Sequence, residues 1–408
     1  MMRKLVASVL LLGLLSPTLL LAQQIGPSVL NLDEVVPEYP RPWDREALVV
    51  LDFTVKSDGS VDDIKAVDGF HEPRFVEAAS NAIQQLQFEP ATESGEAVDW
   101  PGFRISARFL VRNQFHGMRA SANSQLTDAE DLIRENKPEE AESALRAVLS
   151  ENTELFFEDA MFNLRLGEVL LATNRPAEAV HALKRATQTY LPDENNDFNL
   201  ESAVNHNRFF IINLPEIFVN DFITTGLQAH HTANAPRVAT PAPLQRGAQR
   251  GQGRRGANER PKASLEVLNN TLLESAYQRQ YLANISTGNV AAVINTYNNL
   301  ENLNDDAISE QMQNQIEQVR QLQNANQRLT SAQVIMNGET IHHPSHRILA
   351  AVNVAGEIVS LDFQCESRVI RLPFQAEVEW NMPESWGQCA IRFRGEDGAS
   401  FNLVEFPE

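Results

Sequence analysis

Three histidines near residue 342 have the type and the close spacing of possible metal ligands. His342, His343 and His346 stand within five positions of one another, and imidazole nitrogen is a common ligand of zinc and other transition metals. Pro344 interrupts any helical spacing between them. We interpret them as polar loop residues, and the pair at residues 230–231 in the same way, so the sequence predicts no metal and no cofactor.

Other residue patterns that could support catalysis are equally weak. Nothing resembles a nucleophile elbow, in which a serine is presented to a histidine base. The glycines at residues 246–256 have no strand before them and no apolar helix after them, so they do not predict a phosphate loop. The acidic pairs at residues 62–63 and 305–306 suit turns and helix caps. We therefore expect no enzyme, with a hydrolase built from scattered residues as an alternative.

The first 22 residues have the pattern of a secretory signal peptide. Arg3 and Lys4 precede a long apolar run that ends at Ala22, a residue small enough for a cleavage site. The alternative is a retained membrane anchor, but the shortness of the run and Pro17 favour cleavage. We expect an exported protein that contacts the membrane only if this signal is retained.

Charge and cysteine content narrow the class of protein further. The 408 residues carry a formal net charge of −20, with a sequence pI of about 4.9, which argues against a nucleic-acid-binding protein. Cys365 and Cys389 are the only cysteines. Because exported proteins meet an oxidising environment, we expect these two to form a disulfide.

Residues 48–67 carry the clearest local pattern, two strands joined by a tight turn. Apolar side chains alternate from Val49 to Val55, which is the period of a half-buried strand. Asp58-Gly59 then favours a hairpin, because glycine readily adopts the positive φ that the turn needs. A helix is predicted from Pro73 onward and a last alternating strand at residues 103–111. This order predicts a small three-stranded antiparallel sheet with a helix over one face.

Short motifs around these elements are shared with a known family. They are PEYPRP, FTVKSDGSV, FVEAASNAI and LQFEPATESGEAV, and together they make residues 35–112 resemble the TonB carboxy-terminal domain family. The resemblance implies a periplasmic domain that pairs with envelope or outer-membrane proteins, or with a second copy of the chain. Energy-transducing members carry a retained anchor and a long proline-rich spacer. Here residues 23–37, extended at ~3.5 Å each, would reach only about 50 Å.

An exposed edge of such a sheet can accept an extended peptide by strand addition. We expect the free edge to be the last strand, residues 103–111. Its side chains at Arg104, Ser106 and Arg108 alternate with the apolar ones and point away from the apolar face. These three are the predicted partner-binding residues.

The middle of the chain changes to a helical pattern with an internal repeat. Asn136-Lys137-Pro138 and Asn174-Arg175-Pro176 occupy equivalent places, each between two amphipathic segments. Each copy resembles a tetratricopeptide repeat, a helix–turn–helix unit, and Thr287-Gly288-Asn289 is a candidate third turn. Such a stack would offer a concave surface to a second partner. The predicted helical regions are residues 124–231 and 263–330.

Between these helical regions, residues 232–262 are rich in Gly, Pro, Ala, Gln and Arg and have almost no large apolar residue. An RNA-like Arg-Gly tract and a tether to an anionic surface are two possible interpretations, but an exported protein meets little RNA. We therefore favour a disordered linker. Beyond it, residues 332–408 alternate again, with hairpin turns at Ala355-Gly356 and Asp397-Gly398, and predict a small antiparallel β domain.

The sequence as a whole predicts an α+β multidomain protein. Its parts are a small antiparallel sheet with a covering helix, an α-helical repeat region and a carboxy-terminal antiparallel β domain. The favoured function is a periplasmic binding or scaffold protein that uses its sheet edge and its helical surface. The alternative is a membrane-retained energy transducer of the TonB type for outer-membrane transport.

Overall fold

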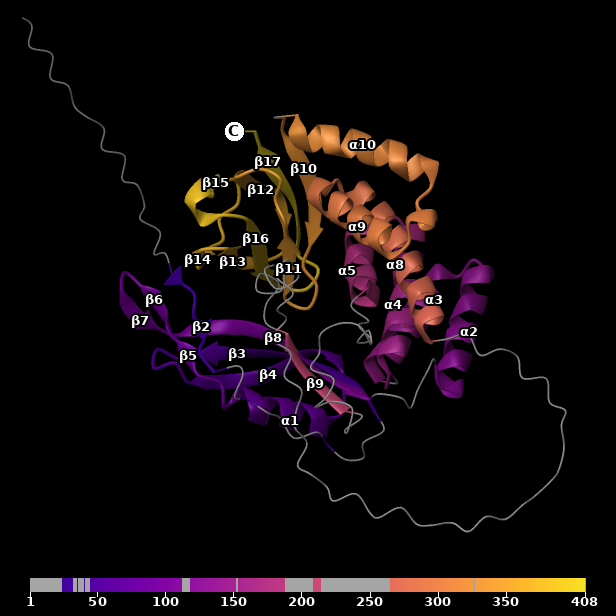
Figure 1. Ribbon diagram of the computed structural model, residues 1–408, viewed down its shortest axis with the longest axis horizontal. Coiled ribbons are helices and arrows are strands. Elements are labelled where there is room, and N and C mark those ends of the chain that lie inside the picture. Colours follow the sequence, from indigo (N-terminus) through magenta and orange to yellow (C-terminus); the bar gives the residue numbers. More distant parts are fainter. Residues whose placement is uncertain are drawn as a thin grey trace, which may run out of the picture.

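The computed structural model describes residues 24–31, 35, 40, 45–111, 118–151, 153–187, 208–213, 265–325 and 327–407. These residues form the predicted α+β fold, with an N-terminal sheet, a helical middle and a C-terminal antiparallel β region (Figure 1). The predicted signal peptide and the predicted linker at residues 232–262 lie outside the described residues. No helix in the described part of the chain is long and apolar enough to cross a membrane.

The N-terminal sheet is built on the predicted hairpin. Gly59 has φ of 82°, and its N–H donates to the carbonyl of Lys56 to close the turn. The strands lie in the order β4-β3-β8-β9, and one helix, α1, packs on the sheet. The bounds are β3 Ala47–Val55, β4 Val61–Phe70, α1 Pro73–Ile83, β8 Trp100–Val111 and β9 Arg208–Asn213.

The alternating apolar side chains of β3 and β8 form one face of this sheet, which we call the apolar face. Phe53 is 1 % exposed and Phe109 is fully buried. Helix α1 covers them, with Phe75 stacked edge-on against Phe109 at 5.0 Å between ring centroids. The prediction of a helix over this face is confirmed.

Two expectations about this sheet are wrong. The sheet has four strands, not three, because β9 pairs antiparallel with β8 from Ser106↔Asn213 to Val111↔Arg208. The outer edge of β8, which was expected to be free, is therefore occupied. The second face, which carries Asp52 and Arg104 and which we call the polar face, is also covered. Helix α5 (Pro176–Thr187) and the C-terminal strands β10 (Leu329–Val334) and β11 (Glu339–His342) line a cavity together with Arg104 and Ser106. The alternation of charged residues does not predict this cover, because it is also typical of a solvent-facing surface.

Both predicted Asn-x-Pro turns join pairs of helices in the same way. Asn136 and Asn174 have φ of 60° and 58°, and the residue after each donates its N–H to the carbonyl five positions earlier, Leu132 or Leu170. Proline then opens the next helix, where its missing N–H costs nothing. The helices are α2 Ala120–Arg134, α3 Pro138–Glu151, α4 Phe156–Ala172 and α5 Pro176–Thr187.

Close packing between these helices depends on small residues. A Cβ on Gly167 would stand 2.5 Å from Cγ of Leu183, and Ala141 and Ala179 are fully buried. Helix α8 (Leu265–Thr287) packs on α4 and α5, and α9 (Val290–Leu303) follows after a turn at Gly288, with α10 (Glu310–Asn324) beyond it. The two repeats are therefore pairs of helices. Their assignment to the tetratricopeptide family stays a prediction.

The C-terminal region consists of two antiparallel sheets that pack on a shared apolar core. One sheet has the order β10-β17-β12-β15, and the other contains β11-β16-β13-β14. Cys365 and Cys389 lie directly opposite each other on β13 and β16 and form the expected disulfide. The bounds are β10 Leu329–Val334, β11 Glu339–His342, β12 Ile348–Ala355, β13 Ile358–Cys365, β14 Arg368–Pro373, β15 Trp380–Asn381, β16 Cys389–Gly395 and β17 Ser400–Phe406.

Short strands near the N-terminus join the two β regions. Strand β1 (Gln24–Ile25) lies between β14 and β6 (Ala91–Glu93), which in turn pairs with β7 (Glu96–Val98). One seven-stranded sheet therefore runs from the C-terminal region to a hairpin of the N-terminal region. A second bridge, β2 (Ser28–Val29) with β5 (Phe88–Glu89), holds the same segment in place.

Candidate binding site

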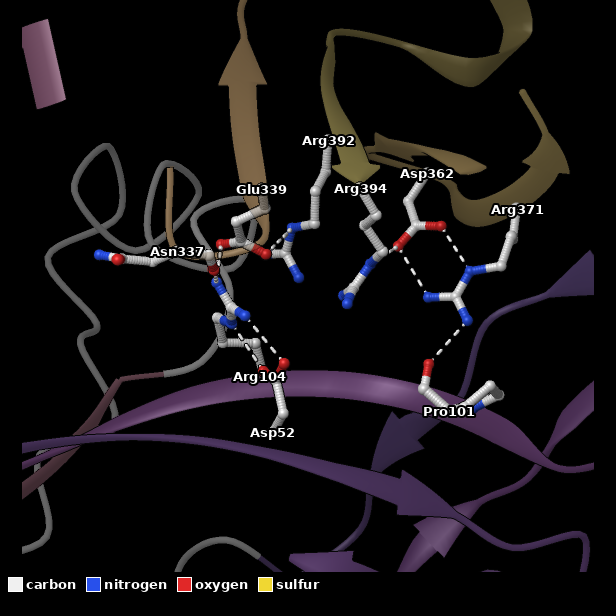
Figure 2. A network of polar contacts seen from close by, with 9 residues as sticks. All are labelled: Asp52, Pro101, Arg104, Asn337, Glu339, Asp362, Arg371, Arg392 and Arg394. Carbon is white, nitrogen blue, oxygen red and sulfur yellow. Dashed lines mark hydrogen bonds and ion pairs between the residues drawn. The ribbon is translucent and has the colours of Figure 1, made fainter. Parts of the chain in front are cut away.

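The polar face of the N-terminal sheet meets the helices and the C-terminal sheets at a junction rich in ion pairs. Arg104 on β8 lies opposite Asp52 on β3, and its Nε and Nη2 donate to the two Asp52 oxygens at 2.6 and 2.8 Å. Its Nη1 donates to the carbonyl of Asn337 at 2.7 Å (Figure 2). Arg104 thus ties the sheet to the turn before β11.

That turn is formed by Asn337 and Gly338, which both have positive φ, 53° and 79°. The Asn337 side chain donates to Asp68 on β4 at 2.8 Å. The turn therefore contacts β4 through its side chain and β8 through its carbonyl. Asn-Gly is the strongest short hairpin signal in a sequence, and it could have identified this turn, although not its contacts.

Arg185 on α5 forms the link to the helices. Its guanidinium donates to Asp159 on α4 at 2.9 and 3.1 Å and to Asp68 at 2.8 Å. Burial alone would lower the pKa of Arg185, but the charges of the two carboxylates outweigh it and raise the pKa. Burial raises the pKa of Asp159, which is only 4 % exposed. The guanidinium of Arg185 is therefore the group that compensates Asp159 inside the protein.

A second group of charged side chains lies on the C-terminal sheet, beside the group around Arg104 (Figure 2). Asp362 accepts from Arg371 at 2.6 and 2.9 Å and from Arg394 at 3.2 Å. Burial alone would raise the pKa of Asp362, but the hydrogen bonds from Arg371 outweigh it and lower the pKa. Arg371 also donates to the carbonyl of Pro101 at 2.7 Å, which joins the two regions again.

Arg104, Asn337 and Arg185 line a cavity of about 260 Å³ between the N-terminal sheet, α5, α8 and the C-terminal strands. His181 on α5 lines it and bonds through Nε2 to the carbonyl of Val334 at 3.0 Å. Because a carbonyl only accepts, Nε2 carries the proton in this contact. Burial lowers the pKa of His181, so the ring is neutral. The arrangement can bind a polar molecule, and it presents no nucleophile paired with a base in the described residues.

The structure brings the predicted partner-binding residues together on the polar face, but not at a free edge. Arg104 holds the sheet against the C-terminal region, and Ser106 lines the cavity. The Arg108 guanidinium lies 5.9 Å from the Phe156 ring centroid on α4. Their role in binding a partner stays a prediction.

The histidines at residues 342–346 have structural partners. His342 is fully buried, and its Nε2 lies 2.9 Å from Oε1 of Glu405 on β17. Burial alone would raise the pKa of Glu405, but hydrogen bonds from His342 and from the backbone N–H groups of His346 and Ser345 lower it. No cluster of three or more His, Cys, Asp or Glu side chains suited to a metal occurs among the residues that the structure describes.

Comparison with known protein families supports the predicted resemblance. Residues 36–109 match the family described as the Gram-negative bacterial TonB protein C-terminal. The match spans β3, β4, α1 and most of β8, and it ends before α2. Domains of that family serve protein interaction and transport, so the match indicates a TonB-like, envelope-associated protein. No curated protein matches the chain.

Proposed function

We propose that the chain is an exported periplasmic scaffold that binds extended strands of envelope proteins along the outer edge of β8. The observation that supports this most strongly is the pairing of β9 with that edge over six residue pairs. An antiparallel strand from a distant part of the chain already lies where a partner strand would add. The match to the TonB C-terminal family points to the same kind of interaction.

In this proposal a partner strand takes the place of β9 along residues 106–111. Ser106 and Arg108 lie within the paired length, and Arg104 lies just outside it. The partner would therefore bind through the main chain of β8, while Arg104 keeps the sheet seated against the C-terminal region. A β9 strand from a second copy of the chain could bind at the same edge, so self-association is one outcome of the test.

The helical pairs α2–α3 and α4–α5 would supply a second surface, as tetratricopeptide repeats do. Their equivalent turns at Asn136 and Asn174 support the repeat assignment. A scaffold with two surfaces would hold a strand-forming partner and a second partner at once. The signal peptide predicted for residues 1–22 supports a periplasmic location for this activity.

The experiment is an affinity pull-down from envelope extract, with variants that release or lock β9. Substituting proline at both Ile211 and Ile212 removes two successive backbone N–H groups of β9. Adjacent amides of a strand point to opposite sides, so one of the two faces β8. The control is alanine at the same two positions, which removes the same side chains and keeps the N–H groups. We expect the proline variant to retain more of each strand-binding partner than the alanine variant.

The locking variant is Ser106→Cys with Asn213→Cys, which are direct partners in the β8–β9 register. Cross-strand neighbours at such a position are close enough for a disulfide. Oxidised protein should lose the partners and the same protein under mild reduction should regain them, with wild type treated alike as the control. Equal retention by the released and the locked forms would refute docking at this edge. Recovery of full-length protein in the inner-membrane fraction would instead favour the energy transducer.

A further inference from the structure

The wall of the junction cavity is rich in cations. Its volume of about 260 Å³ is close to the ~300 Å³ lower end of small-ligand pockets. In a chain with a net charge of −20, such a wall is a local feature that favours an anion. The charged side chains that line the cavity are Arg104, Lys184, Arg185, Arg392, Asp68 and Glu339.

Arg392 on β16 is a wall residue whose charge is weakly compensated by the carboxylate of Glu339. Its side chain is 3 % exposed, and its ion pair with Glu339 spans 3.5 Å. Its Nε makes no hydrogen bond to any residue that the structure describes. Burial lowers the pKa of Arg392, and the neighbouring charge of Arg394 lowers it further. A buried cation in this state is costly unless another group supplies negative charge.

The contacts around Arg392 involve more arginines than carboxylates. Four guanidinium groups stand against three carboxylates in the contacts that Figure 2 displays. The arginines of the network are Arg104, Arg371, Arg392 and Arg394, and the acids are Asp52, Glu339 and Asp362.

The same cavity also has acceptors without donors. Oδ1 of Asn284 on α8 and Oε2 of Glu339 are buried, and neither accepts a hydrogen bond within the described part of the chain. Both residues line the cavity, and Asn284 is only 1 % exposed. A ligand that satisfies the wall therefore needs an anionic group for Arg392 and a donor for these oxygens.

We propose that the cavity binds a small carboxylate that also carries a hydroxyl or amino group. The carboxylate accepts from the Arg392 guanidinium, whose planar donors match carboxylate geometry. The hydroxyl or amino group donates to Asn284 or Glu339. This cavity shares Ser106 with the proposed β8–β9 edge, but neither proposal depends on the other.

Isothermal titration calorimetry of the full mature chain tests the ligand class. L-malate, L-glutamate, succinate and inorganic phosphate are titrated at constant ionic strength in chloride buffer. We expect malate or glutamate to bind about tenfold more tightly than succinate, which lacks the donor group, and more tightly than phosphate. No binding by malate and glutamate, or equal affinity for succinate, overturns the proposal. Tightest binding by phosphate overturns the choice of a carboxylate.

Variants assign the binding to this cavity. Arg392→Met should weaken binding at least about tenfold. The matched control is Arg371→Met, which removes an arginine of the same network that does not line the cavity, and its affinity should stay within about threefold of wild type. Equal loss in both variants would mean that the arginines act on stability alone and would refute the site.

A second pair of variants tests the site even if Arg392→Met fails to fold. Ala177 lies in the first turn of α5 on the cavity wall, where an added carboxylate is compatible with the helix dipole. Ala177→Asp should weaken binding of the anion by at least about tenfold, and the neutral, nearly isosteric Ala177→Asn should weaken it less than about threefold. Unchanged affinity in Ala177→Asp, in protein that melts like Ala177→Asn, refutes binding in this cavity.

Discussion

The two faces of the N-terminal sheet are covered in different ways. On the apolar face, Phe53 and Phe109 pack with Phe75 of α1 in one hydrophobic core. On the polar face, Asp52 and Arg104 form ion pairs that reach the C-terminal region, and Asp68 on β4 reaches α5 through Arg185. Both faces are protected from solvent, but by different interactions.

The two kinds of contact have different roles. The apolar contacts stabilise the N-terminal sheet, and the ion pairs position it. Apolar burial is non-directional and roughly proportional to area, so the apolar face stabilises the sheet as a unit. Buried ion pairs gain little net energy after desolvation but are costly when one partner is lost. The polar face therefore fixes where the sheet sits against the helices and the C-terminal region. Changes on the two faces should have different consequences.

The largest effect is expected on the apolar face. Phe109→Ala should destabilise the protein by about 3–5 kcal/mol, because it removes a buried ring and leaves a cavity under α1. Urea denaturation monitored by circular dichroism measures this free energy of unfolding. Phe109→Leu is the control and should cost less than half as much, whereas equal losses would mean that the ring's volume is not what matters.

The next largest effect is expected at Arg185 on the junction with the helices. Arg185→Met leaves the buried Asp159 without its guanidinium and should cost about 3 kcal/mol in the free energy of unfolding. Combining it with Asp159→Leu should recover much of this loss, because the uncompensated carboxylate is gone. A double variant as unstable as the single one would contradict the idea that charge compensation is the main role of Arg185.

A smaller effect is expected at Gly102, where β8 lies close to the C-terminal sheet. Gly102 has φ of 69°, and a Cβ there would stand 2.6 Å from Nη1 of Arg394. Gly95 has φ of 90° with nothing within 4 Å of its Cβ position, so it isolates the backbone strain. Gly102→Ala should cost about 1 kcal/mol more than Gly95→Ala in thermal or urea unfolding. Equal costs would mean that Arg394 moves aside freely.

The smallest and most gradual effect is a pH dependence from the cavity wall. Burial lowers the pKa of His181 below its usual 6.5, so the unfolded chain binds a proton before the folded protein does. Stability is therefore fully present above pH ~6.5 and falls as the pH drops toward the folded pKa, by at most about 1.4 kcal/mol per pH unit. His181→Gln, which keeps a donor for Val334, should flatten this slope between about pH 6.5 and 5. An unchanged slope would assign it to other groups.

The apolar face was predictable from the sequence and the polar face was not. Alternating apolar residues such as Val49 and Phe53 identify a buried face whatever covers it. Arg104 and Asp52 fit the same alternation, yet a charged side chain that faces solvent and one that faces another region give the same pattern. Only the folded chain brings Asn337, far away in sequence, to within 2.7 Å of Arg104.

The occupied edge of β8 was missed for a related reason. The residues of β9, RFFIIN, suit a strand, but nothing local indicates which edge they would join. The disulfide was predictable because two cysteines in a chain predicted to be exported leave one pairing. The cavity was not, because its wall comes from strands and helices of every region.

The central claim is that the outer edge of β8 accepts an added strand in exchange for β9. The most direct test is fluorescence anisotropy of a labelled peptide that spans residues 208–213, titrated with the mature protein in two forms. The Ile211→Pro/Ile212→Pro variant, whose edge is released, should bind the peptide at least about tenfold more tightly than wild type, whose own β9 competes. Equal affinity in the two proteins, or no binding by either, would contradict the claim.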